Sequence, residues 1–153
     1  MEEFGITDGE APHYLLDSNI VSEIIRADAS FDVIKKLTEH SSDCAICAPS
    51  WQELLYGLYK LPEGASKNFL AKFIENEVPG DFKILSYTKK AAEIHGDLRV
   101  KVEKIGKPTL FADSMIAAVA LANRMILVTG NTRHFEAIQQ VSDLQVENWF
   151  LGE

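Results

Sequence analysis

Short apolar segments suited to buried strands alternate with segments of helical spacing along almost the whole chain. The expected strands cover 13–17, 43–48, 82–86, 125–129 and 144–149, the last as an edge strand. Parallel strands that are buried on both faces appear as nearly continuous apolar runs, and right-handed crossovers join them. The sequence therefore predicts an α/β fold with a mostly parallel central sheet sandwiched by helices.

Start and stop signals mark the helices between these strands. The expected helices cover 18–26, 30–40, 49–61, 66–77, 88–105 and 111–124. Ser30 and Thr88 are expected to cap two of them, and Pro49 fits the first turn of a third. The helix after Ser30 is expected to place Phe31, Ile34 and Leu37 on one face.

The chain has the length and composition of one globular domain. Its 153 residues are 46% hydrophobic and 25% charged, which disfavours both disorder and a fibrous protein. Residues 1–12 lack periodicity, so we expect a flexible leader followed by a domain over 13–150. No apolar run reaches the roughly 18 residues of a membrane span, and the leader has no signal-peptide pattern. We expect a cytoplasmic protein that does not contact membranes.

Charge and cysteine content argue against several classes of function. A net charge of -8 disfavours a general nucleic-acid coat protein, whose affinity depends on Lys and Arg neutralising phosphates. It is compatible with a nuclease, because carboxylates that hold divalent cations meet an anionic substrate through the metal. Cys44 and Cys47 are the only cysteines and lie in a predicted buried strand, which indicates core packing rather than a redox or zinc site.

Acidic residues lie after the first two predicted strands and near the start of a later helix. Asp17 ends the first strand, Glu53 lies in the first two turns of the helix after the second, and Asp113 begins an otherwise apolar helix. Helix capping explains each of them alone, although a buried Asp113 must be capped, paired or bound to metal. The ligand crevice of an open α/β sheet lies at the carboxyl ends of its strands. Together the three acids favour a site for a hard cation such as Mg²⁺ that assists phosphodiester hydrolysis.

Polar residues stand beside these acids at two strand ends. Ser18 and Asn19 follow Asp17, while Thr129 and Asn131 follow the fourth strand. Capping and turn preferences explain these residues as well as a functional role does. We predict that Ser18, Asn19 and Thr129 support the site and that Asn131 is a further candidate catalytic residue.

Three segments resemble one known family. They are LLDSNIVSEII, PSWQELLYG and, most specifically, GKPTLFADSMIAAVALANRMILVTGNTRHF followed by LQVENW, together spanning about 14–150. They resemble the PIN-domain family, particularly its VapC-type toxin ribonucleases. The resemblance implies a Rossmann-like sandwich in which Asp17, Glu53 and Asp113 hold Mg²⁺ or Mn²⁺ and cleave RNA. It also implies a small antitoxin protein, whose Arg or Lys side chain enters the acidic site, and pairing of the chain as a homodimer.

The sequence departs from the family pattern at the fourth acidic position. Many relatives have Asp two residues after the strand-ending Thr, where this chain has Asn131. Some toxin-like relatives have Glu just before the following Phe, where this chain has His134. The departure predicts one metal ion rather than two.

Two other functions remain open at this point. An Asp at the end of the first parallel strand also suits an aspartate-based phosphatase or phosphotransfer domain, with Asp17 as the nucleophile. Asn19 stands where the haloacid-dehalogenase pattern requires a second Asp, which weakens that alternative. The missing fourth acid also permits a degenerate PIN-like module that only binds RNA or protein.

Histidines, basic residues and tryptophans have ordinary structural explanations. The histidines do not form a spaced ligand set and are expected on the surface or on helix faces: His13, His40, His95 and His134. Some basic residues could contact RNA phosphates, although a solvated helix face explains them equally: Arg99, Lys101, Lys104 and Lys107. Both tryptophans, Trp51 and Trp149, are expected to pack against the core or its rim rather than to stack on bases.

Overall fold

The computed structural model describes residues 13–23, 29–76 and 83–151, so the predicted leader lies outside the described residues. The strands are β1 (Tyr14–Leu16), β2 (Cys44–Cys47), β3 (Lys83–Leu85), β4 (Ile126–Val128) and β5 (Val146–Glu147). They form a five-stranded sheet in the order β3-β2-β1-β4-β5, and every pairing is parallel. This arrangement confirms the predicted α/β fold and places β5 at an edge.

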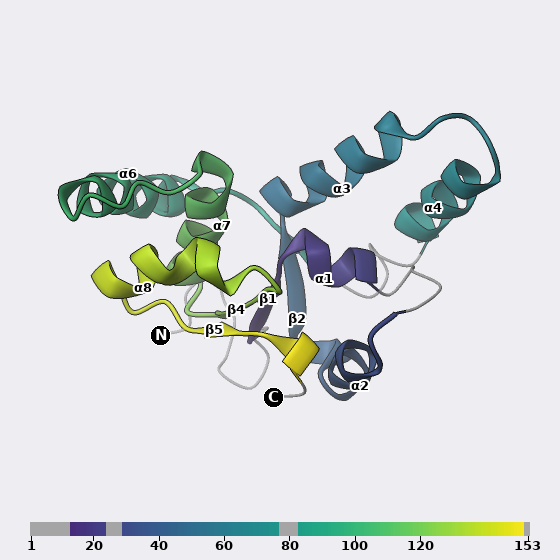
Figure 1. Ribbon diagram of the computed structural model, residues 1–153, viewed down its shortest axis with the longest axis horizontal. Coiled ribbons are helices and arrows are strands. Elements are labelled where there is room, and N and C mark those ends of the chain that lie inside the picture. The colour runs from purple at the N-terminus through teal and green to yellow at the C-terminus, as the bar shows by residue number, and fades with distance from the viewer. Residues whose placement is uncertain (1–12, 24–28, 77–82, 152–153) are drawn as a thin grey trace.

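Side chains alternate between the two faces of the sheet and build one hydrophobic core on each. Leu15 and Leu127 point into the first core, whereas their neighbours Leu16 and Val128 point into the second. The first core is covered by α6 (Lys89–Lys104), α7 (Phe111–Ala122) and α8 (Glu136–Val141). The second is covered by α1 (Ser18–Glu23), α2 (Phe31–Glu39), α3 (Ala48–Lys60) and α4 (Ala65–Asn76). Figure 1 shows the two helical layers on opposite sides of the strands.

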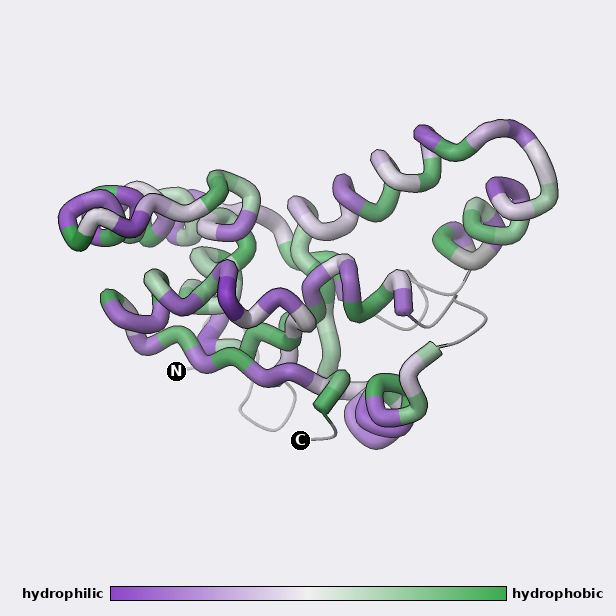
Figure 2. Tube along the Cα trace, viewed as in Figure 1, coloured by the Kyte–Doolittle hydropathy of each residue, from purple (hydrophilic) through white to green (hydrophobic). Residues whose placement is uncertain are grey.

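Hydropathy follows the same layering. The central strands are coloured mainly as hydrophobic in Figure 2, whereas long stretches of α6 and α8 are hydrophilic. Cys44 and Cys47 are free thiols buried in β2, as expected of core cysteines. Trp149, at the start of the short 3-10 helix η4 (Trp149–Leu151), is fully buried and its indole Nε1 donates to Glu147 Oε1 at 2.9 Å. Its predicted packing role is therefore confirmed.

The capping predictions are confirmed, but the expected apolar face of α2 is right only for Leu37. Ser30 Oγ accepts a hydrogen bond from the backbone N of Val33, at the start of α2. Phe31 is 78% exposed and Ile34 36% exposed, because α2 turns Val33 and Leu37 towards the sheet instead. These two buried residues lie four apart, one helical turn, and therefore share a face.

The helix α6 is expected to lose stability when its cap is removed. Thr88 Oγ1 accepts a hydrogen bond from Ala91 N at 3.1 Å, which satisfies one of the free donors at the helix start. Thr88→Ala should lower the free energy of unfolding by about 1 kcal/mol, measured by chemical denaturation. The exposed Ser86, two residues earlier, provides the control, since Ser86→Ala should change this free energy by less than about 0.5 kcal/mol. Equal effects of the two substitutions would contradict a capping role.

Membrane insertion finds no support in the described helices, none of which combines the length and apolarity needed to cross a bilayer.

Candidate active site

The candidate site lies where the strand order reverses, between β1 and β4. In sheets of this type, ligands bind beyond the carboxyl ends of the strands at that point. Asp17 follows β1, and its backbone N donates to Val128 O of β4 at 2.9 Å. Thr129 follows β4 and donates through Oγ1 to Asp17 Oδ2, also at 2.9 Å. The two strand ends are therefore joined at their last residues.

Asp17 is a buried carboxylate with a fixed orientation. Its side chain is 7% exposed, and Oδ1 accepts a second hydrogen bond from Ser18 N at 2.8 Å. Burial raises the pKa of Asp17, while the hydrogen bonds from Thr129 and Ser18 and the nearby His134 act in the opposite direction. The charged form thus carries a desolvation cost that a bound cation would offset.

Asp113, which is on the first turn of α7, lies beside Asp17. Its Oδ2 is buried, makes no hydrogen bond and lies 3.3 Å from His134 Nδ1. Burial raises the pKa of Asp113, and the charges of Asp17 and Glu53 raise it further, whereas His134 lowers it. The three predicted acids are therefore close enough for their charges to interact.

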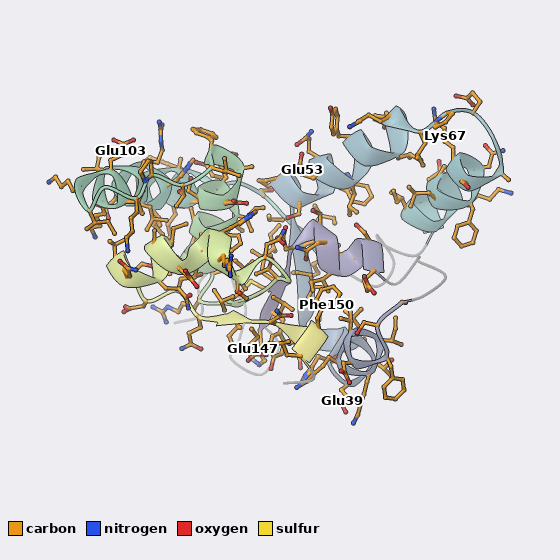
Figure 3. All side chains as sticks on the ribbon, in the orientation of Figure 1. Glu39, Glu53, Lys67, Glu103, Glu147 and Phe150 are labelled. Carbon is orange, nitrogen blue, oxygen red and sulfur yellow. The ribbon has the colours of Figure 1, made fainter. Side chains whose placement is uncertain are left out.

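Glu53 completes this acidic edge from the opposite layer. It lies on the exposed surface of α3, in the half of the helix that follows β2 (Figure 3). Within the described parts of the chain, however, no three His, Cys, Asp or Glu side chains are close enough to hold a metal ion. The structure thus brings the three acids to one edge without forming a closed ligand set.

The acidic edge nevertheless fits one hydrated divalent cation. Mg²⁺ retains several waters and usually binds through one or two carboxylates. The buried Oδ2 of Asp113 lacks a hydrogen-bond donor, and the adjacent Asp17 carries a desolvation cost, so a cation between them would satisfy both. Asp17 and Asp113 could hold the ion directly, while Glu53 could contribute through water.

The two candidate fourth positions differ in what they contribute. His134, on the 3-10 helix η3 (Thr132–Phe135), places its imidazole against the carboxylate of Asp113. Asn131 is exposed, and among the described residues its side chain makes no hydrogen bond. Its backbone N donates to Thr129 Oγ1 at 3.0 Å. In this structure His134, rather than the side chain of Asn131, contacts an acidic site residue.

Asn19 ties the polar turn together. Its Nδ2 donates to Thr129 Oγ1 at 3.3 Å, and its Oδ1 accepts from Gly130 N at 3.4 Å. Thr129 is therefore held by Asn19 while it donates to Asp17. This geometry is what the predicted supporting role of Ser18, Asn19 and Thr129 requires.

A groove with both basic and acidic residues flanks the site on the side of Asp113. It has a volume of about 510 Å³, and its charged or titratable lining residues are Asp113, Glu136, His134, Arg133 and Lys107. Lys107 is thus the only one of the four predicted basic residues in this groove. Sequence analysis missed Arg133, although its position between Asn131 and the buried Phe135 could have indicated it.

Two of the other predicted basic residues have local partners. Arg99 lies over the ring of Phe111, 5.0 Å from its centroid, and Lys101 pairs with Asp97 at 2.8 Å. For both residues, these contacts favour an ordinary solvated helix face over a contact with RNA phosphates.

A buried histidine supports the helix that carries Asp113. His95 of α6 is 3% exposed, so of the two expected positions, the surface or a helix face, it takes a helix face that is buried. Its Nε2 lies 2.7 Å from Ser114 Oγ, and its Nδ1 lies 2.8 Å from Tyr87 Oη. Burial lowers the pKa of His95, and the charge of Arg99 lowers it further. The neutral imidazole thus links α6 to the residue next to Asp113.

Comparison with known proteins identifies the family of this chain. Residues 14–140 match the PIN domain family. Ribonuclease VapC2 of Haemophilus influenzae is 30% identical over 141 residues, which cover 89% of this chain and 97% of that protein. The tRNA(fMet)-specific endonuclease VapC of Shigella flexneri is 31% identical over 138 residues, with the same coverage. The crystal structure of FitAcB from Neisseria gonorrhoeae superposes with a TM-score of 0.81 at 29% identity, covering 90% of this chain and 98% of that one. The chain therefore belongs to the PIN-domain family.

Proposed function

We propose that this protein is an endoribonuclease that hydrolyses RNA phosphodiester bonds with Mg²⁺ or Mn²⁺, as the toxin of a toxin-antitoxin pair. One observation carries the proposal: the buried Asp17 and the partly exposed Asp113 lie close enough at the switch point of the sheet for their charges to interact, and the buried Oδ2 of Asp113 makes no hydrogen bond. The ribonucleases VapC2 and VapC, similar over 89% of this chain, support the same activity.

The position of each acidic residue indicates its role in catalysis. When bound, the cation would activate water and offset negative charge that develops on the phosphate. Asp17 and Asp113 would hold it, with Asp17 kept in place by Ser18 N and Thr129 Oγ1. The carboxylate of Glu53, exposed on α3, is available to accept a proton from the attacking water.

Two cations of the adjoining groove suit the RNA backbone. Arg133 and Lys107 line this groove together with the acidic Asp113 and Glu136, so phosphates of nucleotides beside the cleavage point would meet positive charge at these two basic side chains. The proposed substrate, RNA, would thus contact Arg133 and Lys107 beside the acidic centre.

The proposed partner is a small antitoxin protein. FitB of Neisseria gonorrhoeae, described as a toxin, is 30% identical over 126 residues, and the structure of FitAB bound to a DNA fragment has a TM-score of 0.81. An antitoxin Arg or Lys between Asp17 and Asp113 would replace the charge of the metal, because a guanidinium pairs well with carboxylates. Pairing as a homodimer and a cytoplasmic location remain predictions within this proposal.

The alternative functions find less support. For a phosphatase with Asp17 as the nucleophile, the second acid is missing, and Asn19 uses its amide to hold Thr129 and Gly130. The similar proteins named above are ribonucleases and toxins, not phosphatases. A degenerate binding module would retain the fold but not cleave RNA.

Metal removal tests the proposal. We expect the purified protein to cleave RNA in Mg²⁺ or Mn²⁺, to lose this activity in excess EDTA and to regain it when Mn²⁺ is restored. Gel analysis of a mixture of single-stranded and structured RNA would measure the cleavage. Full activity in EDTA would refute metal dependence, and the absence of cleavage under every metal condition would favour the binding module.

A further inference from the structure

A second groove adjoins the site on the side away from Asp113. It has a volume of about 430 Å³ and lies between α1, the turn after β4 and the turn after β5. Besides Gly130, its lining consists of Asn19, Ser22, Glu23, Asn131, Asn148 and Phe150. The proposed function assigns no role to this groove.

The floor of the groove is joined to the candidate catalytic centre. Thr129 Oγ1 donates to the carboxylate of Asp17 and accepts from Asn131 N and Asn19 Nδ2, at 2.9, 3.0 and 3.3 Å. Only Thr129, through its hydrogen bonds, therefore separates a group bound against Asn19 and Asn131 from Asp17.

Two amide side chains in the groove have unused hydrogen-bonding capacity. Asn148 Oδ1 accepts from Phe150 N at 2.9 Å, but within the described chain its Nδ2 has no partner. The side chain of Asn131 has none for either its oxygen or its nitrogen, again among the described residues. These groups together present two donors and an acceptor of the kind that recognise the edge of a base.

The charges that line the groove favour a base over a phosphate. None of the described residues that line it is Lys or Arg, whereas Arg133 and Lys107 line the groove beside Asp113. Glu23 contributes a buried carboxylate, which accepts a hydrogen bond from Ser30 N at 2.7 Å. The described lining thus offers no cation for a phosphate, while the amide oxygen of Asn131 can accept a hydrogen bond from an exocyclic amino group.

Phe150 supplies an aromatic wall next to the turn. A Cβ on Gly130 would lie 2.8 Å from Phe150 Cε2, so only glycine allows the ring to pack this closely against the turn. Figure 3 shows Phe150 beyond the end of β5. Unpaired RNA bases are commonly bound by aromatic contact together with hydrogen bonds to their edges.

We propose that this groove binds one unpaired nucleobase of the RNA, next to the cleaved phosphate, and prefers bases with an exocyclic amino group. Asn131 and Asn148 contact the edge of the base, and Phe150 packs against it. The proposal rests on the proposed function, because it makes these residues determinants of where RNA is cut. Adenine, cytosine and guanine carry the amino group, whereas uracil does not.

Nucleoside binding in EDTA tests the groove without requiring catalysis. The probes are adenosine, cytidine, guanosine and uridine, titrated into ¹⁵N-labelled protein while the side-chain amide signals of Asn131 and Asn148 are followed by NMR. We expect saturable shifts of both signals, with uridine at least about 5-fold weaker than the strongest binder. Asn148→Asp keeps the acceptor for Phe150 N but replaces the free donor with a charged oxygen. It should change the ratio of nucleoside affinities by roughly 5- to 100-fold.

A matched charge change provides the control. Gln145 is an exposed amide outside the groove, so Gln145→Glu adds the same charge and should leave the ratios unchanged. The proposal is overturned if no nucleoside shifts the two amide signals, if uridine binds as tightly as the others, or if Gln145→Glu acts like Asn148→Asp.

A cleavage readout separates this proposal from the proposed function. In Mg²⁺, Asn148→Asp should change the base preferred beside the cut, whereas Arg133→Ala should slow cleavage of all sequences alike, because it contacts the backbone. Cleavage without nucleoside binding would overturn the groove alone. Nucleoside binding without cleavage would overturn the nuclease function instead.

Discussion

Replacing Asp113 with Asn is expected to abolish RNA cleavage and, at the same time, to stabilise the metal-free protein. The substitution removes one direct ligand of the proposed cation, and the cleavage rate should fall by about 100-fold or more, since such an ion contributes several kcal/mol to transition-state stabilisation. A gel assay in Mg²⁺ or Mn²⁺ measures this loss.

The stabilisation follows from the negative charge that this substitution removes. Asp113 Oδ2 is buried without a donor, and its carboxylate interacts with those of Asp17 and Glu53. Because the pKa of Asp113 is raised above 3.8, folding favours the protonated form, so stability falls as the pH rises through the folded pKa. At pH 7 the full penalty is present. Asp113→Asn should therefore raise Tm by roughly 2–4 °C in EDTA at pH 7.

A surface acid and a low pH provide the controls for this result. Asp143 is exposed, so Asp143→Asn should change neither cleavage nor Tm appreciably. The stabilisation by Asp113→Asn should shrink as the pH is lowered towards 3.8, where the carboxyl group of the natural protein is protonated. An Asp113→Asn protein that cleaves RNA normally, or that melts below the natural protein at pH 7, would contradict the role given to this carboxylate.

The layered fold could be predicted because its signals are local. The apolar runs before Asp17 and before Thr129 each fit one buried strand, and the capping residues Ser30 and Thr88 mark the starts of α2 and α6. The order of the strands is not local. The contact between Thr129 and Asp17 joins residues 112 positions apart, and only the assembled sheet identifies β1 and β4 as neighbours.

The distances within the site were harder to predict than the residues that form it. The type and spacing of Asp17, Glu53 and Asp113 indicated a common edge, but not how far apart the carboxylates would lie. That distance depends on how α3 and α7 pack on opposite faces of the sheet. The contacts of His95 could not be predicted for the same reason, because a lone histidine on a helix gives no sequence signal for a hydrogen-bond partner 19 residues away.

His95 is expected to be essential for the stability of the layer that carries Asp113. Its ring is buried between Tyr87 Oη and Ser114 Oγ, at 2.8 and 2.7 Å, and also contacts Phe111. His95→Ala removes both hydrogen bonds and leaves a cavity. It should therefore lower the free energy of unfolding by about 2–4 kcal/mol in chemical denaturation. His95→Gln retains hydrogen-bonding groups and should recover part of this loss.

The pH dependence of the effect distinguishes this histidine from the exposed ones. Burial lowers the pKa of His95 below 6.5, so the folded protein holds the ring neutral while the unfolded chain binds a proton more readily. The stabilising effect is therefore complete above about pH 6.5 and is lost as the pH falls from there through the folded pKa. Subtracting the stability of His95→Ala from that of the natural protein should give a difference that decreases over this range. His13 is exposed, so His13→Ala should change the free energy of unfolding by less than about 0.5 kcal/mol. If the His95 difference instead grew on acidification, the imidazole would be protonated in the folded state, and its assignment as a neutral link between Tyr87 and Ser114 would be wrong.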